Sequence, residues 1–287
     1  MLVQTITSYL ESIAPLSLQE DYDNCGLLVG NREAKVQGVL TCLDCTEAVI
    51  DEAIEKHCNL IIAHHPIIFK GLKSLTQKNY TERIVEKAIR NDVSIYAIHT
   101  NLDNSPIGVN KKICDRLGIK NPKILAPKIV TGKRTFGSGM IGDLKQPLKP
   151  DAFFQMLKQA MKAEAIRHTA VIKKHIAKVA VCGGSGSFLI EEAIRQNADV
   201  LITADMKYHQ FFDADNKLLI VDIGHYESEQ FTKELLAELL MEKFSIFAPL
   251  SAKGKKYLSV EVFRNKKGNK KIPLFISDVN TNPINYL

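Results

Sequence analysis

Histidines and acidic residues follow three short apolar segments of the sequence. The set consists of two adjacent histidines and two His-x-x-x-acid segments: His64, His65, His99, Asp103, His225 and Glu229. Imidazole and carboxylate groups suit Zn²⁺, Mn²⁺, Fe²⁺, Co²⁺ or Ni²⁺. Five or six such ligands exceed the roughly three protein ligands of one catalytic zinc, and they fit two metals that share a bridging carboxylate. The residues therefore favour a dinuclear metal site over the alternative of polar loop residues.

Two further segments carry polar groups beyond that set. Asp205, Lys207 and His209 follow the apolar segment 200–203 and suit substrate binding or proton transfer, although a solvated helix start would explain them equally well. The loop Gly183-Gly184-Ser185-Gly186 lies between a predicted strand and helix. Its amides, at Gly184, Ser185 and Gly186 above all, could hold a phosphate, and a tight turn is the alternative.

The elements that must position these residues alternate between strand and helix. Strands are predicted over 36–44, 60–63 and 93–98, and helices over 46–57 and 80–91. Short apolar strands alternating with amphipathic helices favour a largely parallel sheet. Ligands bind beyond the carboxyl ends of such strands, which is where the histidines lie.

The same order of elements recurs about halfway along the chain. Shifting the sequence by 140 residues aligns 39–63 with 179–203, with identical residues that include Cys42/Cys182 and Glu52/Glu192. This weak internal repeat predicts two similar α/β domains joined within the polar stretch 120–150. We expect a first domain over 1–126 and a second over 127–287, with part of the C-terminus packed on the first.

Composition and charge exclude several classes of protein. Of 287 residues, 45% are hydrophobic and 24% are charged, which is ordinary for a globular protein. No apolar stretch approaches the roughly 20 residues of a membrane span, and the N-terminus lacks a signal-peptide pattern. The six scattered cysteines indicate reduced thiols. We therefore expect a cytoplasmic protein without a membrane partner.

The net charge of +6 has a local origin. Residues 253–271 contain eight basic residues and one acid, which leaves 30 basic and 31 acidic residues elsewhere. We interpret the basic stretch as the turn of a β-hairpin formed by 257–263 and 272–279. No aromatic residues interleave with its lysines, so nucleic acid is not an expected partner.

Two short motifs favour structural roles. Residues 137–142 fit G-x-G-x-x-G, but no helix clearly follows, and close chain packing explains them better than dinucleotide binding. Cys42 and Cys45 form a C-x-x-C without a partner pair, which indicates buried core thiols.

Long ordered motifs make the sequence resemble the NIF-three-like family, also called GTP cyclohydrolase I type 2 homologues. They are DYDNCGLLVG (21–30), IIAHHPIIFKGLKSL (61–75), YAIHTNLDN (96–104), ITADMKYHQ (202–210) and IGHYESEQ (223–230). The resemblance implies a two-domain α/β protein with two divalent metals at the domain interface. It also implies a homohexamer, built as a trimer of dimers.

By the same resemblance, the metal ligands are His64, His65, Asp103, His225 and Glu229, with Glu229 as the bridging carboxylate. His99 is placed beside the metals as a proton-transfer or ligand-orienting group. The family name implies hydrolytic opening of a purine ring with release of formate, and phosphoester hydrolysis is equally compatible with two metals. A nucleotide or phosphorylated small molecule is the expected substrate. The alternative is a non-catalytic metal-binding scaffold or regulatory interaction protein.

Overall fold

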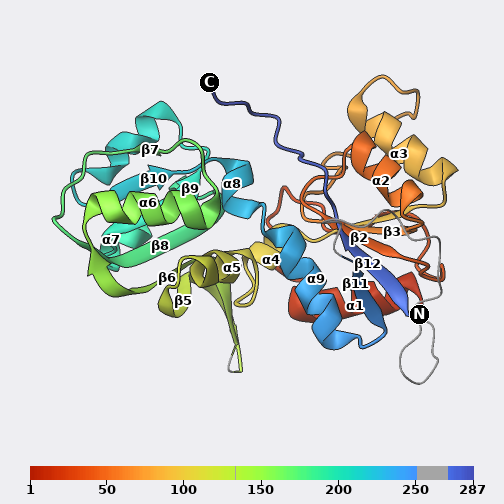
Figure 1. The fold of residues 1–287 in the computed structure, drawn as a ribbon, viewed down its shortest axis with the longest axis horizontal. Coiled ribbons are helices and arrows are strands. Elements are labelled where there is room, and N and C mark those ends of the chain that lie inside the picture. Colours follow the sequence, from red (N-terminus) through yellow and green to blue (C-terminus); the bar gives the residue numbers. More distant parts are fainter. Residues whose placement is uncertain (133, 251–270) are drawn as a thin grey trace. The chain divides into compact units, whose positions relative to one another are not determined.

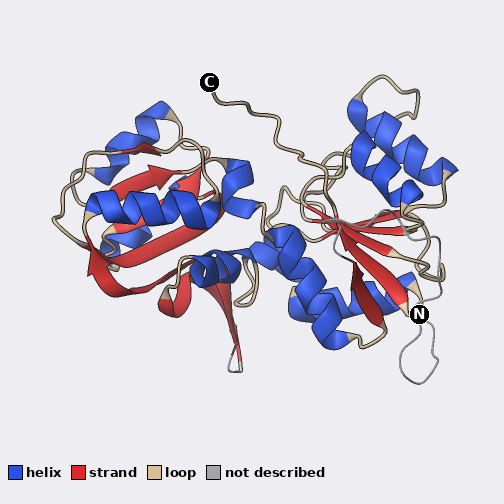
Figure 2. Ribbon diagram, in the orientation of Figure 1, coloured by secondary structure: helices blue, strands red, loops and turns tan. Residues whose placement is uncertain are grey.

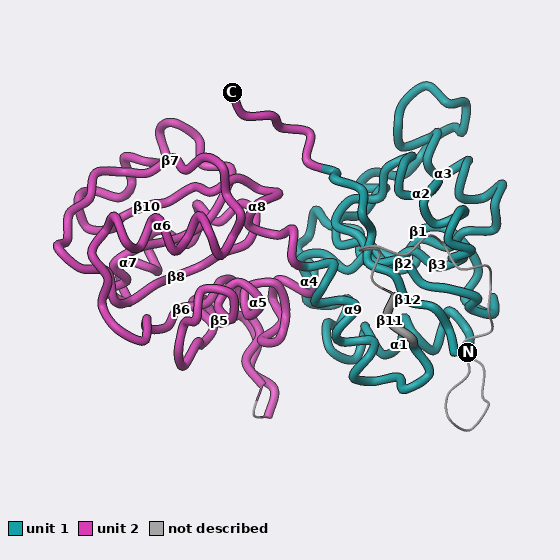
Figure 3. Tube along the Cα trace, viewed as in Figure 1, with its two compact units in different colours: residues 1–101, 232–281 teal, residues 102–231, 282–287 magenta. Residues whose placement is uncertain are grey.

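The computed structural model describes residues 1–132, 134–250 and 271–287. The chain forms two compact units, each built around its own sheet (Figures 1 and 3). Unit 1 comprises residues 1–101 and 232–281, and unit 2 comprises residues 102–231 and 282–287. The predicted α/β class with two similar parts is confirmed.

The described residues of unit 1 form a six-stranded sheet in the order β1-β4-β3-β2-β12-β11, in which β1 is antiparallel to its neighbour and the other neighbouring pairs are parallel. Its strands are β1 (Gly26–Val29), β2 (Val39–Cys42), β3 (Leu60–Ala63), β4 (Ser94–Ala97), β11 (Phe247–Leu250) and β12 (Ile272–Ile276). Its helices are α1 (Val3–Ile13), the 3-10 helix η1 (Leu16–Leu18), α2 (Glu47–Glu55), α3 (Tyr80–Arg90) and α9 (Thr232–Lys243). The short helix α4 (Thr100–Asp103) spans the point where the chain passes from unit 1 to unit 2.

Helices cover both faces of this sheet (Figure 2). One face packs alternate strand residues such as Leu40 and Ile61 against Val49 of α2 and Ile84 of α3. The strands β2, β3 and β4 are buried along their whole length, which explains their continuous apolar runs. Side chains cap the helices: Thr46 accepts from an amide of α2, and Asn79 does so for α3.

Unit 2 contains a second six-stranded sheet, in the order β5-β6-β8-β9-β10-β7. Its strands are β5 (Lys120–Thr131), β6 (Arg134–Leu148), β7 (Arg167–His168), β8 (Ile176–Ser185), β9 (Val200–Ala204) and β10 (Leu219–Asp222). Its helices are α5 (Val109–Arg116), α6 (Pro150–Met161), α7 (Ile190–Arg195) and α8 (His225–Glu229), with the 3-10 helices η2 (Ser187–Leu189) and η3 (Tyr208–Ala214). The long antiparallel pair β5–β6 occupies most of the stretch 120–150, within which we expected the two halves to be joined.

The internal repeat extends to strand register. Val39 pairs with Leu60 in unit 1, and Val179 pairs with Val200 in unit 2, so the 140-residue shift carries one strand pair onto the other. In both sheets the next strand, β4 or β10, lies parallel beside β3 or β9. The histidine segments of each unit therefore follow the carboxyl ends of corresponding strands.

The two units do not follow a division after residue 126, because β12 pairs with β2 and residues 102–126 cluster with unit 2. As a statement about independently folding domains, the boundary between 1–126 and 127–287 stays a prediction. In the expected hairpin, 272–276 is a strand, but its proposed partner 257–263 lies outside the described residues. Within the described part of the chain, no helix combines the length and apolar character that crossing a bilayer requires.

Candidate metal centre

Three histidine rings gather at the carboxyl edge of β3 and β4 in unit 1. His64 and His65 follow β3, His99 follows β4, and one ligand nitrogen from each lies within 4.8 Å of the other two. The ring centroids are 4.8 Å apart for His64–His65 and 5.2 Å apart for each pair that includes His99. We call these residues the histidine cluster; adjacent parallel strands bring together His64 and His99, which are 35 residues apart in the sequence.

Each ring of the histidine cluster has its Nδ1 within hydrogen-bond distance of an oxygen acceptor. The acceptors are the Ile98 carbonyl for His64 (2.8 Å), Asp44 for His65 (2.7 Å) and Asp23 for His99 (2.9 Å). An Nδ1 that donates to oxygen fixes the tautomer and leaves the Nε2 lone pair for a metal. The arrangement is therefore typical of metal-ligating histidines.

The two carboxylates behind these rings are themselves held by further donors. Asp23 has no exposed side-chain surface, and it accepts from the Asn24 amide (2.7 Å), the Thr100 amide (3.0 Å) and the Cys25 thiol (3.2 Å). Burial opposes ionisation of Asp23, but the hydrogen bonds and positive charge of His99 outweigh it and hold the pKa of this carboxyl well below its usual range.

Asp44 behaves similarly, with a second donor from a distant part of the chain. The Thr281 hydroxyl donates to its Oδ2 at 2.5 Å, while His65 occupies Oδ1. Burial raises the pKa of Asp44, but the hydrogen bond and positive charge of His65, together with the hydrogen bond from Thr281, outweigh it, so the net shift of the pKa is downward. Neither Asp23 nor Asp44 was among the predicted site residues; Asp23 lies within a quoted family motif, which was the one available signal.

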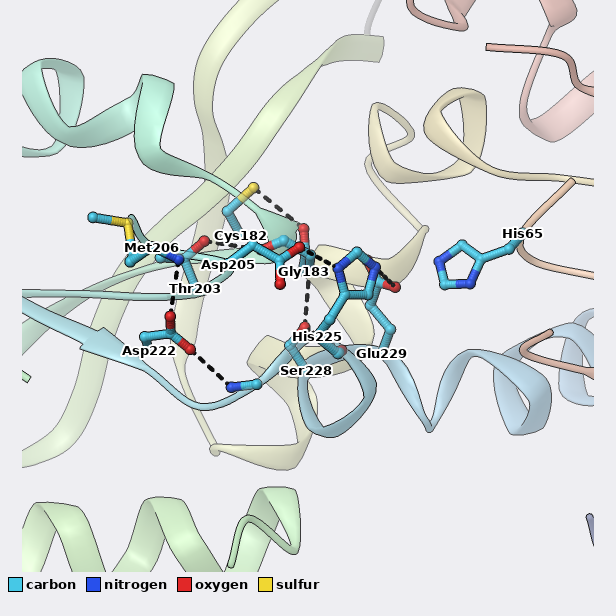
Figure 4. Close-up of polar contacts among 12 residues, drawn as sticks. His65, Cys182, Gly183, Thr203, Asp205, Met206, Asp222, His225, Ser228 and Glu229 are labelled. Carbon is cyan, nitrogen blue, oxygen red and sulfur yellow. Dashed lines mark hydrogen bonds and ion pairs between the residues drawn. The ribbon is translucent and has the colours of Figure 1, made fainter. Parts of the chain in front are cut away.

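Unit 2 holds a second cluster around α8, formed by Asp103, His225 and Glu229, which we call the carboxylate cluster. His225 Nε2 lies 3.0 Å from Glu229, and its Nδ1 lies 2.6 Å from Asp205 (Figure 4). Burial disfavours the charged imidazolium, but the two carboxylates outweigh it and raise the pKa of His225 to about 11. Carboxylate oxygens of Asp103 and Glu229 lie within 4.8 Å of each other. The Glu229 side chain is buried.

The glycine-rich loop packs directly on this cluster. Gly184 has φ +61°, and a Cβ built there would lie 2.6 Å from Glu229 Oε1 and 3.2 Å from His225 Cε1. The Gly183 amide donates to Asn110 and the Gly184 amide to Ser228, both at 2.9 Å. These two amides are thus engaged within the protein, and the close approach of Glu229 accounts for the glycine; phosphate binding at Ser185 and Gly186 stays a prediction.

The remaining predicted residues lie on the segment that follows β9. Asp205 adopts a left-handed backbone with φ +55° and orients His225, so its observed contact is to the cluster. Lys207 and His209 are exposed, at the start of η3 beside the exposed Tyr208. Of these three residues, the structure brings only Asp205 into hydrogen-bond contact with a cluster histidine.

Both clusters fit a divalent metal by the chemistry of their donors. The histidine cluster offers three imidazoles oriented through Nδ1, and the carboxylate cluster offers two carboxylates and an imidazole. Such mixed nitrogen and oxygen donors are those that Zn²⁺, Mn²⁺, Fe²⁺ and related ions take. The C-x-x-C thiols Cys42 and Cys45 are instead buried in the core of unit 1.

Comparisons with known proteins agree with the resemblance seen in the sequence. Residues 1–251 match the family Duf34/NIF3 (NGG1p interacting factor 3). A Clostridium acetobutylicum protein named GTP cyclohydrolase 1 type 2 homolog is 38% identical over 228 residues, which cover 79% of this chain and 85% of that protein.

Solved structures give the same result over the whole chain. The crystal structure of a Bacillus cereus protein related to NIF3 has 26% sequence identity and a TM-score of 0.85, covering 100% of this chain and 99% of that one. A hypothetical protein from Staphylococcus aureus has 31% identity and a TM-score of 0.84 with the same coverage. The chain therefore belongs to the Duf34/NIF3 family.

Proposed function

We propose that the histidine cluster and the carboxylate cluster together bind two divalent metal ions, and that the protein is a metal-dependent hydrolase. The observation that carries this proposal is the shared orientation of His64 and His65, each with Nδ1 on an oxygen acceptor. A packing role would not require both adjacent rings to share that orientation, whereas metal ligation through Nε2 does.

The proposed ligands are His64, His65, Asp103, His225 and Glu229. Glu229 is the proposed bridging ligand, because its buried carboxylate lies within 4.8 Å of an Asp103 oxygen and 3.0 Å from His225. Metal ions held by such groups supply Lewis acidity and bring the pKa of water down towards about 7. Zinc, manganese, iron, cobalt and nickel all suit the donors.

His99 is the proposed proton-transfer group. Its ring lies beside His64 and His65, and the buried Asp23 carboxylate holds its Nδ1. A carboxylate behind an imidazole fixes the ring orientation and stabilises the protonated form, which suits the transfer of a proton to a leaving group. Phe69 packs edge-on against the same ring, with centroids 5.9 Å apart, and limits its movement.

The proposed substrate is a nucleotide or another phosphorylated small molecule. The name of the C. acetobutylicum relative suggests GTP, and hydrolysis of a phosphoester suits two metals equally well. Lys207 and His209 are exposed next to the residue that orients His225, so they are proposed to bind the anionic end of the substrate. A cytoplasmic homohexamer, a trimer of dimers, is the proposed assembly.

Metal content tests the proposal first. We expect elemental analysis of protein purified without chelator to give about two metals per chain, and less than one after His64→Ala/His65→Ala. His175→Ala is the matched control, because His175 is exposed and belongs to neither cluster. Wild-type content below one metal per chain, unchanged by the double substitution and not restored by added metal, would reject the proposal and favour a scaffold.

Turnover assays test the catalytic part separately. Metal-loaded protein is assayed for formate release from GTP and for hydrolysis of p-nitrophenyl phosphate. We expect His99→Ala to retain its metals and to lose turnover by about 10²–10⁴-fold, the usual contribution of a general acid or base. Loss of metal on His99→Ala would instead make His99 a ligand, and metal-loaded protein without turnover on either substrate class would favour the scaffold.

A further inference from the structure

The C-terminal tail after β12 enters a buried charged network in unit 1. The Ser277 hydroxyl and the Asp278 amide donate to Glu52, at 2.5 and 2.9 Å. Lys56 contacts both Glu52 (2.5 Å) and Asp278 (3.1 Å), and the Glu52 and Lys56 side chains are almost fully buried. Burying such a pair is costly unless its remaining hydrogen-bonding groups are satisfied. The tail supplies those partners to Glu52.

Comparison with the internal repeat indicates that the burial of this network depends on the tail. Glu192 is the repeat counterpart of Glu52, yet it forms an ion pair with Arg195 on the surface of unit 2, where Arg195 is 72% exposed. The same residue at the same place in the βαβ plan is therefore buried in unit 1, where residues 277 and 278 cover it. The network fixes the tail just before it reaches Asp44.

Thr281 then contacts the carboxylate behind a predicted ligand. Its hydroxyl donates to Asp44 Oδ2 at 2.5 Å, and Asp44 Oδ1 lies 2.7 Å from His65 Nδ1. Both carboxylate oxygens of Asp44 are therefore engaged, one by the tail and one by His65.

The next residues make corresponding contacts in unit 2. Asn282 Nδ2 donates to Glu227 Oε1 at 3.1 Å, and Tyr286 is hydrogen-bonded to the same buried glutamate. The Tyr286 hydroxyl also packs on Gly224, only 3.0 Å from where a Cβ would be. Gly224 immediately precedes His225, so the tail contacts the turn that carries His225.

We propose that residues 277–286 form a strap that positions both candidate ligand sets, through Asp44 behind His65 and through Glu227 on the α8 turn that carries His225. Thr281, which contacts Asp44 in unit 1, and Asn282, which contacts Glu227 in unit 2, are consecutive residues of the chain. Thr281 is a positioning residue in this scheme. The proposal rests on the proposed function, since it assigns the strap a role in metal binding.

Metal titration of the 287-residue chain tests the strap. We expect Thr281→Val, which keeps the shape and removes the donor, to weaken the affinity for Zn²⁺ by about 10–100-fold, as loss of a ligand-orienting hydrogen bond does. Thr281→Ser keeps the hydroxyl and is expected to restore wild-type affinity. A chain ending at Thr281 lacks the Glu227 anchor and is expected to bind Zn²⁺ about 10-fold more weakly. Leu287→Ala is the matched tail control, because Leu287 is exposed and lies outside residues 277–286.

Two results would overturn the strap. Wild-type Zn²⁺ affinity in both Thr281→Val and the truncated chain would remove its role in metal binding. Equal weakening by Thr281→Val and Thr281→Ser would show that the hydroxyl does not position Asp44. Circular dichroism and thermal unfolding of each variant separate loss of fold from loss of positioning.

Hydrogen exchange separates failure of the strap from failure of the proposed function. If the wild-type chain binds no Zn²⁺, the metal centre is rejected, while exchange at amides 225–229 in metal-free protein still reports the unit 2 anchor. We expect truncation after Thr281 to speed that exchange by about tenfold, since the turn would open locally more often. Unchanged exchange would overturn the strap.

Discussion

The substitution Gly184→Ala tests the carboxylate cluster, and the expected displacement of Glu229 follows from the geometry. An added Cβ would lie 2.6 Å from Glu229 Oε1, whereas ordinary contact begins at 3.4 Å. The Glu229 carboxylate must therefore move by roughly 0.8 Å, more than the roughly 0.5 Å that a metal or catalytic site tolerates. The movement also disturbs the 3.0 Å contact between Glu229 and His225. We expect Zn²⁺ affinity to fall by about 10–100-fold.

The backbone contributes a second cost that a control can isolate. At φ +61° an alanine in place of Gly184 costs about 1–2 kcal/mol in the free energy of unfolding. Gly118 has φ +67° and no atom within 4 Å of its built Cβ, so Gly118→Ala carries the backbone cost without the steric displacement. Both variants are expected to lose similar stability in urea unfolding, and only Gly184→Ala is expected to lose Zn²⁺ affinity.

Competition titration with a chromogenic chelator measures the Zn²⁺ affinity of both variants. If Gly184→Ala bound Zn²⁺ as tightly as Gly118→Ala while both stayed folded, Glu229 would not be a metal ligand held by the glycine-rich loop. If Gly184→Ala lost several kcal/mol more stability than its control with unchanged Zn²⁺ affinity, the contact would serve packing alone.

Three further predictions address orientation, pH and thiol chemistry. Asp205→Asn is expected to weaken Zn²⁺ binding about tenfold in the chelator assay, while Asp213→Asn, an exposed carboxylate of the same segment, leaves it unchanged. Asp199 accepts two backbone amides at 2.8 Å, and although burial opposes it, hydrogen bonds including one from a lysine lower its pKa. The ionised Asp199 therefore adds about 1 kcal/mol to the free energy of unfolding above pH 4, and this contribution decreases as the pH falls further. The free energies of unfolding of wild type and Asp199→Asn, measured in urea, should therefore converge at low pH. A difference that stays constant with pH would contradict this prediction. Burial raises the pKa of Cys45 to about 12, so native protein should resist Ellman's reagent at pH 8, whereas all six thiols react after denaturation; fast reaction of the folded protein would refute it.

The sequence alone predicted the repeated βαβ plan because its signal is local. Continuous apolar runs mark strands buried on both faces, and the 140-residue shift that aligns Val39 with Val179 also aligns their strand partners Leu60 and Val200. The helices expected over 46–57 and 80–91 form over Glu47–Glu55 and Tyr80–Arg90. Periodicity and capping residues are short-range properties, so they survive without knowledge of the tertiary structure.

The candidate ligands were also visible in the sequence, since each follows a strand end. His64, His65 and His99 converge because β3 and β4 are parallel neighbours, which the apolar runs imply. The sequence did not predict the strands within 120–150, because prolines and glycines suggest turns. Pro122 and Pro127 lie in β5, an edge strand, where a missing amide donor is tolerated.

Only the tertiary structure decided what orients those ligands and which side chains the C-terminal tail contacts. Asp23 reaches His99 across 76 residues, and Thr281 reaches Asp44 across 237. Whether Glu52 is buried or, like Glu192, pairs on the surface depends on whether a distant segment covers it. Hydrogen bonds between residues remote in sequence produce no periodic sequence pattern, because they depend on the order of the strands in the sheet and on the path of the chain. The sequence therefore determined which donors are present, and folding determined which acceptors they meet.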